Sequence, residues 1–183
     1  MTAQSSQPTL PPSKRGLAAA PGRPGIDPRG PRFGAGITAV LLLVTIGLGL
    51  GSAAGPAATI AARASEPSFV LLVLITALFA WGAFAGVRRH PYGWLYKTLV
   101  RPRVGPPSHL EDPAPPTFSQ GVGLFVTLVG VVLHLAGVPF ALVIFAALAF
   151  VAAFLNSVFD YCLGCQIYLL LLRGGVIKAR PAA

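Results

Sequence analysis

Three long tracts without Asp, Glu, Lys or Arg constrain this chain more than any other feature. They cover residues 33–62, 67–87 and 113–159. A bilayer core of about 30 Å is crossed by about 20 helical residues. The first two tracts therefore predict one membrane span each. The third would be about 70 Å long as a single helix and must fold back. We expect the reversal at residues 136–139, because Gly137 suits a helix end and Pro139 suits the first turn of the next helix.

The predicted fold is all-α, a polytopic transmembrane bundle of four helices plus short interfacial helices. The spans are expected at about 34–54, 68–87, 119–136 and 139–159. Ser119 is a candidate N-cap for the third span. Composition agrees, because 54% of residues are apolar and only 10% are charged. It excludes a nucleic-acid-binding globule despite the net charge of +9, and two cysteines are too few for a disulfide-rich secreted scaffold.

The basic residues predict the orientation of the spans. All 14 except Arg63 fall on one side of the four-span arrangement. Because basic flanks stay in the cytoplasm, we expect a multi-pass inner-membrane protein with both termini and the 88–118 loop cytoplasmic. Small residues after the first span resemble a signal-peptide cleavage site. However, its apolar core starts only near residue 34 and is about 20 residues long, against 7–15 in a signal peptide, so we expect it to be retained.

The segments outside the spans divide the chain further. Residues 1–25 are rich in Ser, Pro, Ala and Gly and are predicted to be a disordered cytoplasmic tail. Residues 26–173 form the membrane domain, and residues 174–183 are a second cytoplasmic tail. Residues 91–97 mix aromatic and basic side chains, which favour the membrane surface and attract anionic headgroups.

Glycines recur every four residues inside the spans. They are Gly47, Gly51 and Gly55, and again Gly82 and Gly86. Small residues at this spacing let helix backbones approach closely. We expect them to pack inside the bundle, and a homo-oligomer interface is the alternative.

The motif with the most chemistry is Cys162-Leu163-Gly164-Cys165, which contains both cysteines of the chain. Thiols at this spacing can form a disulfide, share a metal, exchange electrons with a partner, or simply pack as small apolar side chains. The fourth span should end near Asp160, which places the pair at the cytoplasmic surface, where thiols are kept reduced and a cycling dithiol fits best. If a new helix begins here, over about 166–172, Cys162 lies near its start and is the better nucleophile.

Other polar residues near this motif have weaker interpretations. Asp160 is a candidate proton acceptor for the thiols, but we favour an ion pair with Arg88, Arg89 or Arg173. Asn156 shares a helix face with Asp160 and is a candidate for a bond to a neighbouring helix. His134 lies near the outer end of span three, and we interpret it as an interfacial residue rather than a ligand. His90 and His109 share the cytoplasmic side with the cysteines, but their long, irregular spacing gives little support to a Cys2His2 site. We therefore predict no metal and no cofactor.

Three elements carry a resemblance to a known family. They are Asp27-Pro28-Arg29-Gly30, the PPxFxQG segment at 115–121, and the LNxxxxxCLGC segment at 155–165. With these elements the chain resembles an uncharacterised bacterial membrane family known only as a domain of unknown function. The resemblance covers about residues 25–173. It implies a multi-span membrane protein that works with thioredoxin-like or sulfurtransferase partners. An acidic residue commonly follows the second cysteine in that pattern, whereas this chain has Gln166.

The four-span scaffold is also similar in form to the quinone-linked disulfide-forming reductases. Those proteins place their reactive pair on the outer side and usually carry a second pair, and this chain has neither feature. Two functional classes remain. In one, Cys162 and Cys165 form a redox or sulfur-relay dithiol that serves a soluble partner. In the other, the protein is a non-enzymatic scaffold or subunit that packs through its glycines.

Overall fold

The computed structural model describes residues 17–19, 22 and 24–177. The predicted tails therefore lie largely outside the described residues. Four helices are long and apolar enough to cross a membrane, which confirms the predicted fold class. These four are α1 (Arg29–Gly49), α3 (Pro67–Ala85), α6 (Ala114–Leu135) and α7 (Ala141–Phe159). The shorter elements are α2 (Ile60–Ala64), η1 (Val87–Arg89), α4 (Pro91–Leu95), the π-helix η2 (Tyr96–Val100), α5 (Arg101–Val104) and α8 (Leu163–Arg173).

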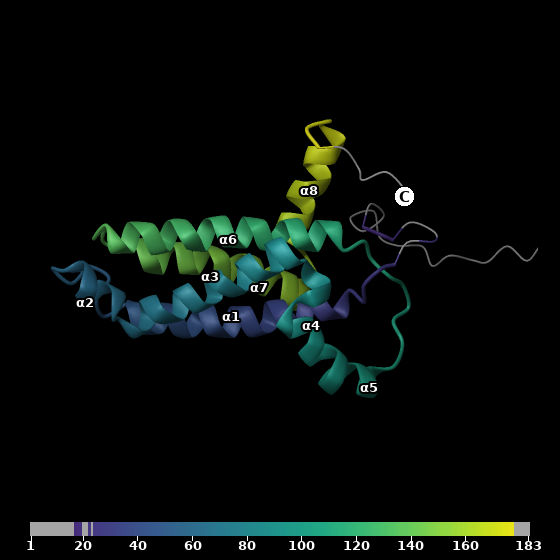
Figure 1. The fold of residues 1–183 in the computed structure, drawn as a ribbon, viewed down its shortest axis with the longest axis horizontal. Helices are drawn as coiled ribbons and strands as arrows, with labels where there is room; N and C mark the ends of the chain where they lie inside the picture. Colours follow the sequence, from purple (N-terminus) through teal and green to yellow (C-terminus); the bar gives the residue numbers. More distant parts are fainter. Residues whose placement is uncertain (1–16, 20–21, 23, 178–183) are drawn as a thin grey trace, which may run out of the picture.

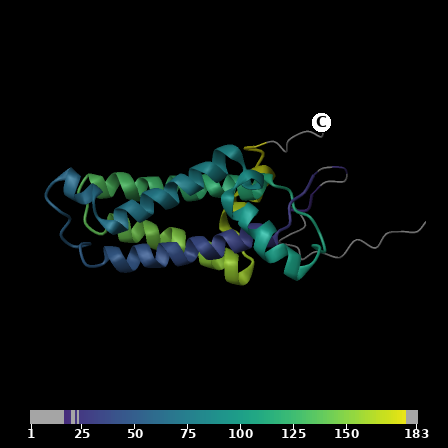
Figure 2. The same ribbon diagram turned by 60° about the horizontal axis from the view of Figure 1, so that its bottom comes forward.

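The four long helices lie side by side in an elongated bundle (Figures 1 and 2). Helix α1 packs mainly along α7 and α3 mainly along α6, and contacts between α6 and α7 and between α1 and α3 close the bundle. We call the end where α1 and α6 begin and α3 and α7 end the basic end. Helices α4, α5 and α8 all lie at this end, whereas α2 lies at the opposite end (Figure 1).

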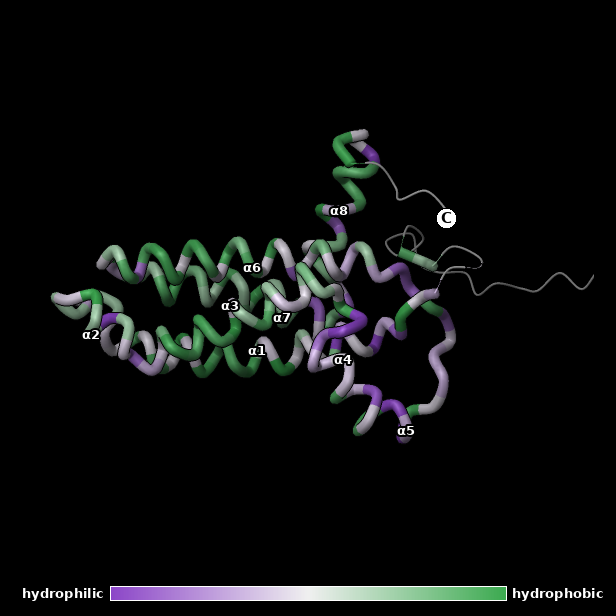
Figure 3. The backbone as a smooth tube through the Cα atoms, viewed as in Figure 1, coloured by the Kyte–Doolittle hydropathy of each residue, from purple (hydrophilic) through white to green (hydrophobic). Residues whose placement is uncertain are grey.

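The bundle consists mostly of hydrophobic residues along its length, and hydrophilic segments gather at the basic end (Figure 3). Large side chains such as Leu43, Phe84 and Phe125 are exposed on its surface. In water such a surface would be unstable, but in a bilayer it faces acyl chains of the same polarity. The multi-pass membrane character predicted from the sequence therefore holds in three dimensions.

The beginning of α6 differs from the expectation. It begins at Ala114, and Ser119 lies inside the helix, so the N-cap prediction for Ser119 was wrong. Pro115 and Pro116 fit the first turn because its N–H groups have no intrahelical partner, so two missing donors cost little there. Asp112 accepts a hydrogen bond from Ala114 N at 2.8 Å and satisfies one of the donors that remain.

The beginning of α1 also lies earlier than expected. The helix starts at Arg29 rather than near residue 34, and it ends at Gly49. The first span was predicted to start after Arg32 because charged residues were not expected within it. Arg29 and Arg32 are tolerated because both lie in the first turn, where their long side chains reach polar partners beyond the apolar core. Arg29 pairs with Asp27 at 2.9 Å, and Arg32 with Asp160 at 3.5 Å.

The predicted reversal between α6 and α7 is confirmed. Gly137 has a φ of 80°, a left-handed conformation that glycine adopts without strain. Its N–H donates to His134 O at 2.9 Å, and Val138 N donates to Leu133 O at 3.0 Å, which closes the end of α6. Pro139 lies in the turn and not in the first turn of α7, which begins at Ala141.

The core between the helices is apolar, with a few buried hydroxyls. Leu42, Leu72 and Ala146 are completely buried at its centre. Thr45 and Thr76 are also buried, and each donates to the carbonyl one turn earlier, at 2.8 and 2.7 Å. Hydroxyls that bond within their own helix add no unsatisfied polar group to the membrane interior.

His134 lies in the last turn of α6 at the opposite end of the bundle, near the predicted outer end of the span, and its side chain is buried. Its Nε2 lies 3.7 Å from Glu66 Oε2, and its ring stacks on Phe69 with centroids 5.5 Å apart. Glu66 also accepts a hydrogen bond from Ser52 Oγ at 2.9 Å. These contacts join α6 to the connection between α1 and α3.

The predicted glycine packing is only partly correct. A Cβ at Gly47, Gly51 or Gly55 would meet no atom within 4 Å, so these three glycines do not mediate close helix packing in the described bundle. Gly82 does pack closely, because a Cβ there would lie 2.6 Å from Gln120 Cγ. Spacing alone did not separate the two cases, since it carries no information about which way a helix face points.

Candidate functional site: the Cys162–Cys165 pair

A break in the chain between α7 and α8 positions the cysteines. Asp160 ends α7 with a φ of 56°, and short polar side chains tolerate this left-handed conformation. Helix α8 then starts at Leu163 and points away from the bundle (Figure 1). The predicted break therefore exists, and the new helix begins three residues earlier than the expected 166.

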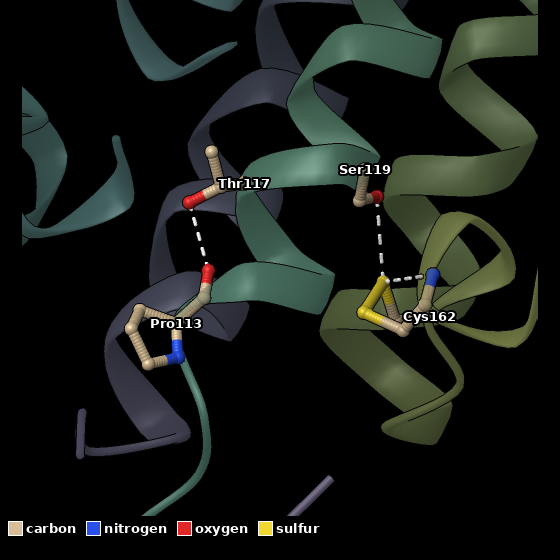
Figure 4. Close-up of a disulfide and its surroundings, with 5 residues drawn as sticks. Pro113, Thr117, Ser119 and Cys162 are labelled. Carbon is tan, nitrogen blue, oxygen red and sulfur yellow. Dashed lines mark hydrogen bonds between the residues drawn. A yellow bond between two sulfur atoms is a disulfide. The ribbon is translucent and has the colours of Figure 1, made fainter. Parts of the chain in front are cut away.

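Cys162 is the N-cap of α8. Its Sγ accepts a hydrogen bond from Cys165 N at 3.3 Å and lies 3.4 Å from Ser119 Oγ on α6 (Figure 4). The N-terminus of a helix carries a partial positive charge, and both neighbours can donate to a negatively charged sulfur. This position therefore favours the thiolate form of a reduced Cys162.

Cys162 and Cys165 are paired with each other as a disulfide. Their sulfur atoms lie close to disulfide distance and their Cα atoms are 5.2 Å apart (Figure 4). Cys162 is partly exposed, whereas Cys165 is buried with 3% of its surface accessible. An incoming reagent therefore reaches Cys162 first.

Gly164 explains how α8 comes so close to α6. A Cβ at this position would lie 2.7 Å from both the Cα and the Cβ of Ser119, nearer than van der Waals contact allows. Only a residue without a side chain lets the start of α8 rest on α6 at this point. The glycine between the cysteines thus sets the contact between Cys162 and Ser119.

One residue from the N-terminal segment, Leu17, packs against the buried cysteine. Leu17 is 6% exposed and packs in one cluster with Cys165 and Leu169. The Leu17 carbonyl accepts a hydrogen bond from Asp112 N at 2.8 Å, which fixes the segment on the loop before α6. The part of the predicted tail that the structure describes therefore contacts the site.

A cavity of about 330 Å³ extends from the cysteine pair into the bundle. It lies between α1, α6, α7 and α8, and its deeper wall contains Ala149 and Leu148, about three turns from the end of α7. Its polar lining side chains include Thr38, Ser119, Gln120, Asn156 and Gln166. The volume lies at the lower end of the range of about 300–1,000 Å³ found for small-molecule sites.

Asp160 is in an ion pair, as favoured, but its partner differs from those predicted. Arg32 Nη1 lies 3.5 Å from Asp160 Oδ2, and Arg32 Nη2 donates to Ser157 O at 3.3 Å. Arg88, Arg89 and Arg173 had been expected, because nothing in the sequence shows that α1 lies beside α7. Asp160 and Asn156 both line the cavity, but α7 ends at Phe159 and Asp160 has a left-handed conformation, so the two do not share a helix face as predicted.

The histidines are not gathered around the thiols. His90 Nε2 lies 3.1 Å from Leu78 O, and His109 lies 3.6 Å from Glu111. Among the described residues, no group of three or more His, Cys, Asp or Glu side chains is placed to hold a metal ion. The Cys2His2 arrangement therefore has no geometric support.

Residues 26–173 match a family described as Domain of unknown function (DUF4395). The chain belongs to this family. The DUF4395 region contains all four spans, the cysteine pair and α8, and it starts after the N-terminal tail. No curated protein and no solved structure matches the chain.

Several residues of the site were missed by sequence reasoning. Ser119 was assigned to a helix cap, and Gln120 and Arg32 were given no role. Leu17 was placed in a disordered tail. One signal was available for Ser119 and Gln120, since both lie in the PPxFxQG element that carries the family resemblance.

Proposed function

We propose that Cys162 and Cys165 are a redox-active dithiol that exchanges electrons with a soluble thiol protein at the cytoplasmic surface. The observation that carries the proposal is the position of Cys162. It caps α8, contacts Ser119, and is the more accessible sulfur of a pair whose second member is buried. A thiol that only packs in a core needs neither a helix N-terminus nor a polar neighbour.

The reaction follows from this asymmetry. The reduced Cys162 thiolate attacks one sulfur of the partner's disulfide, the partner's S–S bond breaks, and its other sulfur leaves as a thiolate. Cys165 then attacks Cys162 Sγ and releases the second partner sulfur. Two electrons pass from the dithiol to the partner. Because Cys162 reacts as a thiolate, the Cys165 proton passes to one partner thiolate, and the other partner thiolate takes its proton from water. The same steps run in reverse when a partner dithiol reduces the Cys162–Cys165 disulfide.

Candidate partners are proteins with their own reactive cysteines, of the thioredoxin-like or sulfurtransferase kind. The side chains beside Cys162 suit a protein contact, because Tyr161 is 44% and Leu163 is 36% exposed. The competing function, a scaffold that packs through its glycines, is less well supported. Gly47 has open space around it, but Gly51 and Gly55 lie beyond the end of α1 and do not continue a helical stripe.

Trapping of the mixed disulfide tests the proposal. We expect a Cys165→Ser protein in cells to accumulate a mixed disulfide with its partner, because the resolving sulfur is missing. The matched Cys162→Ser protein should not, since its remaining thiol is buried. Mass spectrometry of the trapped species distinguishes a thioredoxin-like partner from a sulfurtransferase. Slow and equal alkylation of both cysteines, seen only after unfolding, would identify buried structural thiols and refute the proposal.

A further inference from the structure

A second cavity, separate from the cysteines, lies at the basic end. It has a volume of about 510 Å³ and lies between the start of α1, helix α4, the π-helix η2 and the loop before α6. The α1 wall contains Gly34, and a Cβ there would lie 3.2 Å from the Cβ of Tyr92. Ile26 and Glu111 exchange backbone hydrogen bonds at 2.8 and 2.9 Å, which holds the loop before α6 beside the start of α1.

Three basic side chains line this cavity: Arg88, Lys97 and Arg101. They lie on η1, η2 and α5, all within the connection between α3 and α6, and Lys97 and Arg101 are four residues apart on adjoining helical segments. Arg88 donates to Gly25 O at 3.2 Å, which holds its guanidinium at the cavity wall.

Asp27 also lines the cavity, but its charge is already compensated. Arg29 donates to both of its oxygens at 3.0 and 2.9 Å, and the Tyr96 hydroxyl donates to Oδ2 at 3.0 Å. Partial burial on its own would raise the pKa of Asp27. The hydrogen bonds from Arg29 and Tyr96 and the Arg29 charge outweigh it and hold that pKa below its ordinary value. The three basic side chains therefore leave the cavity with surplus positive charge.

The surroundings of the cavity resemble a membrane interface. Trp94 of α4 is 68% exposed next to the apolar bundle, a typical place for an interfacial aromatic ring. Apolar side chains, among them Val87 and Leu110, share the cavity wall with the cations. A ligand with a negative head and an apolar body would satisfy both parts of the wall.

We propose that this cavity binds a phosphate group, of the kind carried by an anionic lipid headgroup or by a small soluble phosphate ester. The two Arg side chains supply forked donors that match phosphate oxygens, and Lys97 adds a point charge. Neither cysteine lines this cavity, although Gln120 lines both this cavity and the one beside the cysteines.

Ligand-dependent melting of the purified full-length protein in neutral detergent tests this proposal. The probes are dioctanoyl phosphatidylglycerol, glycerol 3-phosphate, and zwitterionic dioctanoyl phosphatidylcholine as the control lipid. The cavity variant is Arg88→Gln, Lys97→Gln, Arg101→Gln. The matched control removes the same charge outside the cavity, with Arg89→Gln, Arg103→Gln, Arg173→Gln. Lys97→Gln alone provides a milder variant if the triple does not fold.

We expect phosphatidylglycerol to raise the melting temperature in a saturable way. Its apparent affinity should fall at least tenfold in the cavity variant and less than threefold in the control. An equal response to glycerol 3-phosphate, lost in the same variant, also supports the site and assigns it to soluble esters. The proposal is overturned if neither anion stabilises the protein. It is also overturned if phosphatidylcholine acts as strongly as phosphatidylglycerol, or if both triple variants lose affinity equally.

Discussion

Gly164 of α8 rests directly on Ser119 of α6, so closely that a Cβ on Gly164 would lie 2.7 Å from the Cα of Ser119. This contact joins two segments that lie far apart in the sequence. It places the Ser119 hydroxyl 3.4 Å from Cys162 Sγ. The geometry of the candidate site therefore depends on the absence of a side chain between its two cysteines.

Substitution of this glycine should disturb both stability and reactivity. We expect Gly164→Ala to cost about 2 kcal/mol, because the added methyl group forces α8 away from α6. Alkylation of the reduced Cys162 should slow in the same variant. The control is Gly121→Ala on α6, where a Cβ meets no atom within 4 Å. Melting in detergent and alkylation rates measure the two effects, and equal behaviour of both variants would contradict the packing argument.

The Ser119 hydroxyl should support the thiolate form of Cys162. A single hydrogen bond contributes about 0.5–1.5 kcal/mol, so Ser119→Ala should slow alkylation of the reduced protein at neutral pH by roughly three- to tenfold. Ser157→Ala is the matched control, because its hydroxyl bonds to Phe154 O at the same end of the bundle. Stopped-flow alkylation measures the rates, and an unchanged rate in Ser119→Ala would show that the hydroxyl has no part in activation.

His90 should make the protein less stable in mild acid. Burial lowers its pKa, and the hydrogen bond to Leu78 O opposes this only in part. The folded-state pKa of His90 lies below the unfolded value of about 6.5, so folding favours the neutral imidazole. The contribution of the neutral imidazole to the free energy of unfolding is therefore complete above that value and is lost as the pH falls through the folded pKa. We expect the melting temperature to fall from about pH 7.5 to about 5.5, and to fall less in His90→Asn, which keeps a helix-capping acceptor. If the melting temperatures of the wild-type and His90→Asn proteins fell equally with pH, His90 would not be the source of the acid sensitivity.

The orientation of the protein remains a prediction of its charge pattern. Reporter fusions after Arg63 and after Arg180 should show Arg63 outside and the C-terminus in the cytoplasm, because the basic flanks resist translocation. The fusion after Arg63 serves as the internal control, since it must give the opposite signal. An exported C-terminus would invert the arrangement and would place Cys162 in an oxidising compartment.

Some features of the fold and site followed from local sequence. The spans, the reversal at Gly137 and a break near Asp160 were predictable, because hydropathy, left-handed turns and helix ends depend on residues close together in the chain. The same local reasoning made Cys162 the leading candidate, since it placed that residue near the start of α8. Helix boundaries shifted by several residues where Pro115 and Arg29 were accommodated in first turns.

The partners of these residues were decided only by the tertiary structure. The neighbouring sequence does not show that Asp160 pairs with Arg32 or that Leu17 packs against Cys165. It also does not show that Gly47 has open space around it while Gly164 packs tightly. The physical reason is that lipid and protein core are equally apolar, so the sequence of a membrane helix scarcely marks which face turns inward. Helix number and length are encoded residue by residue along this chain, whereas helix rotation, and with it the surroundings of the cysteines, emerges only when the bundle packs.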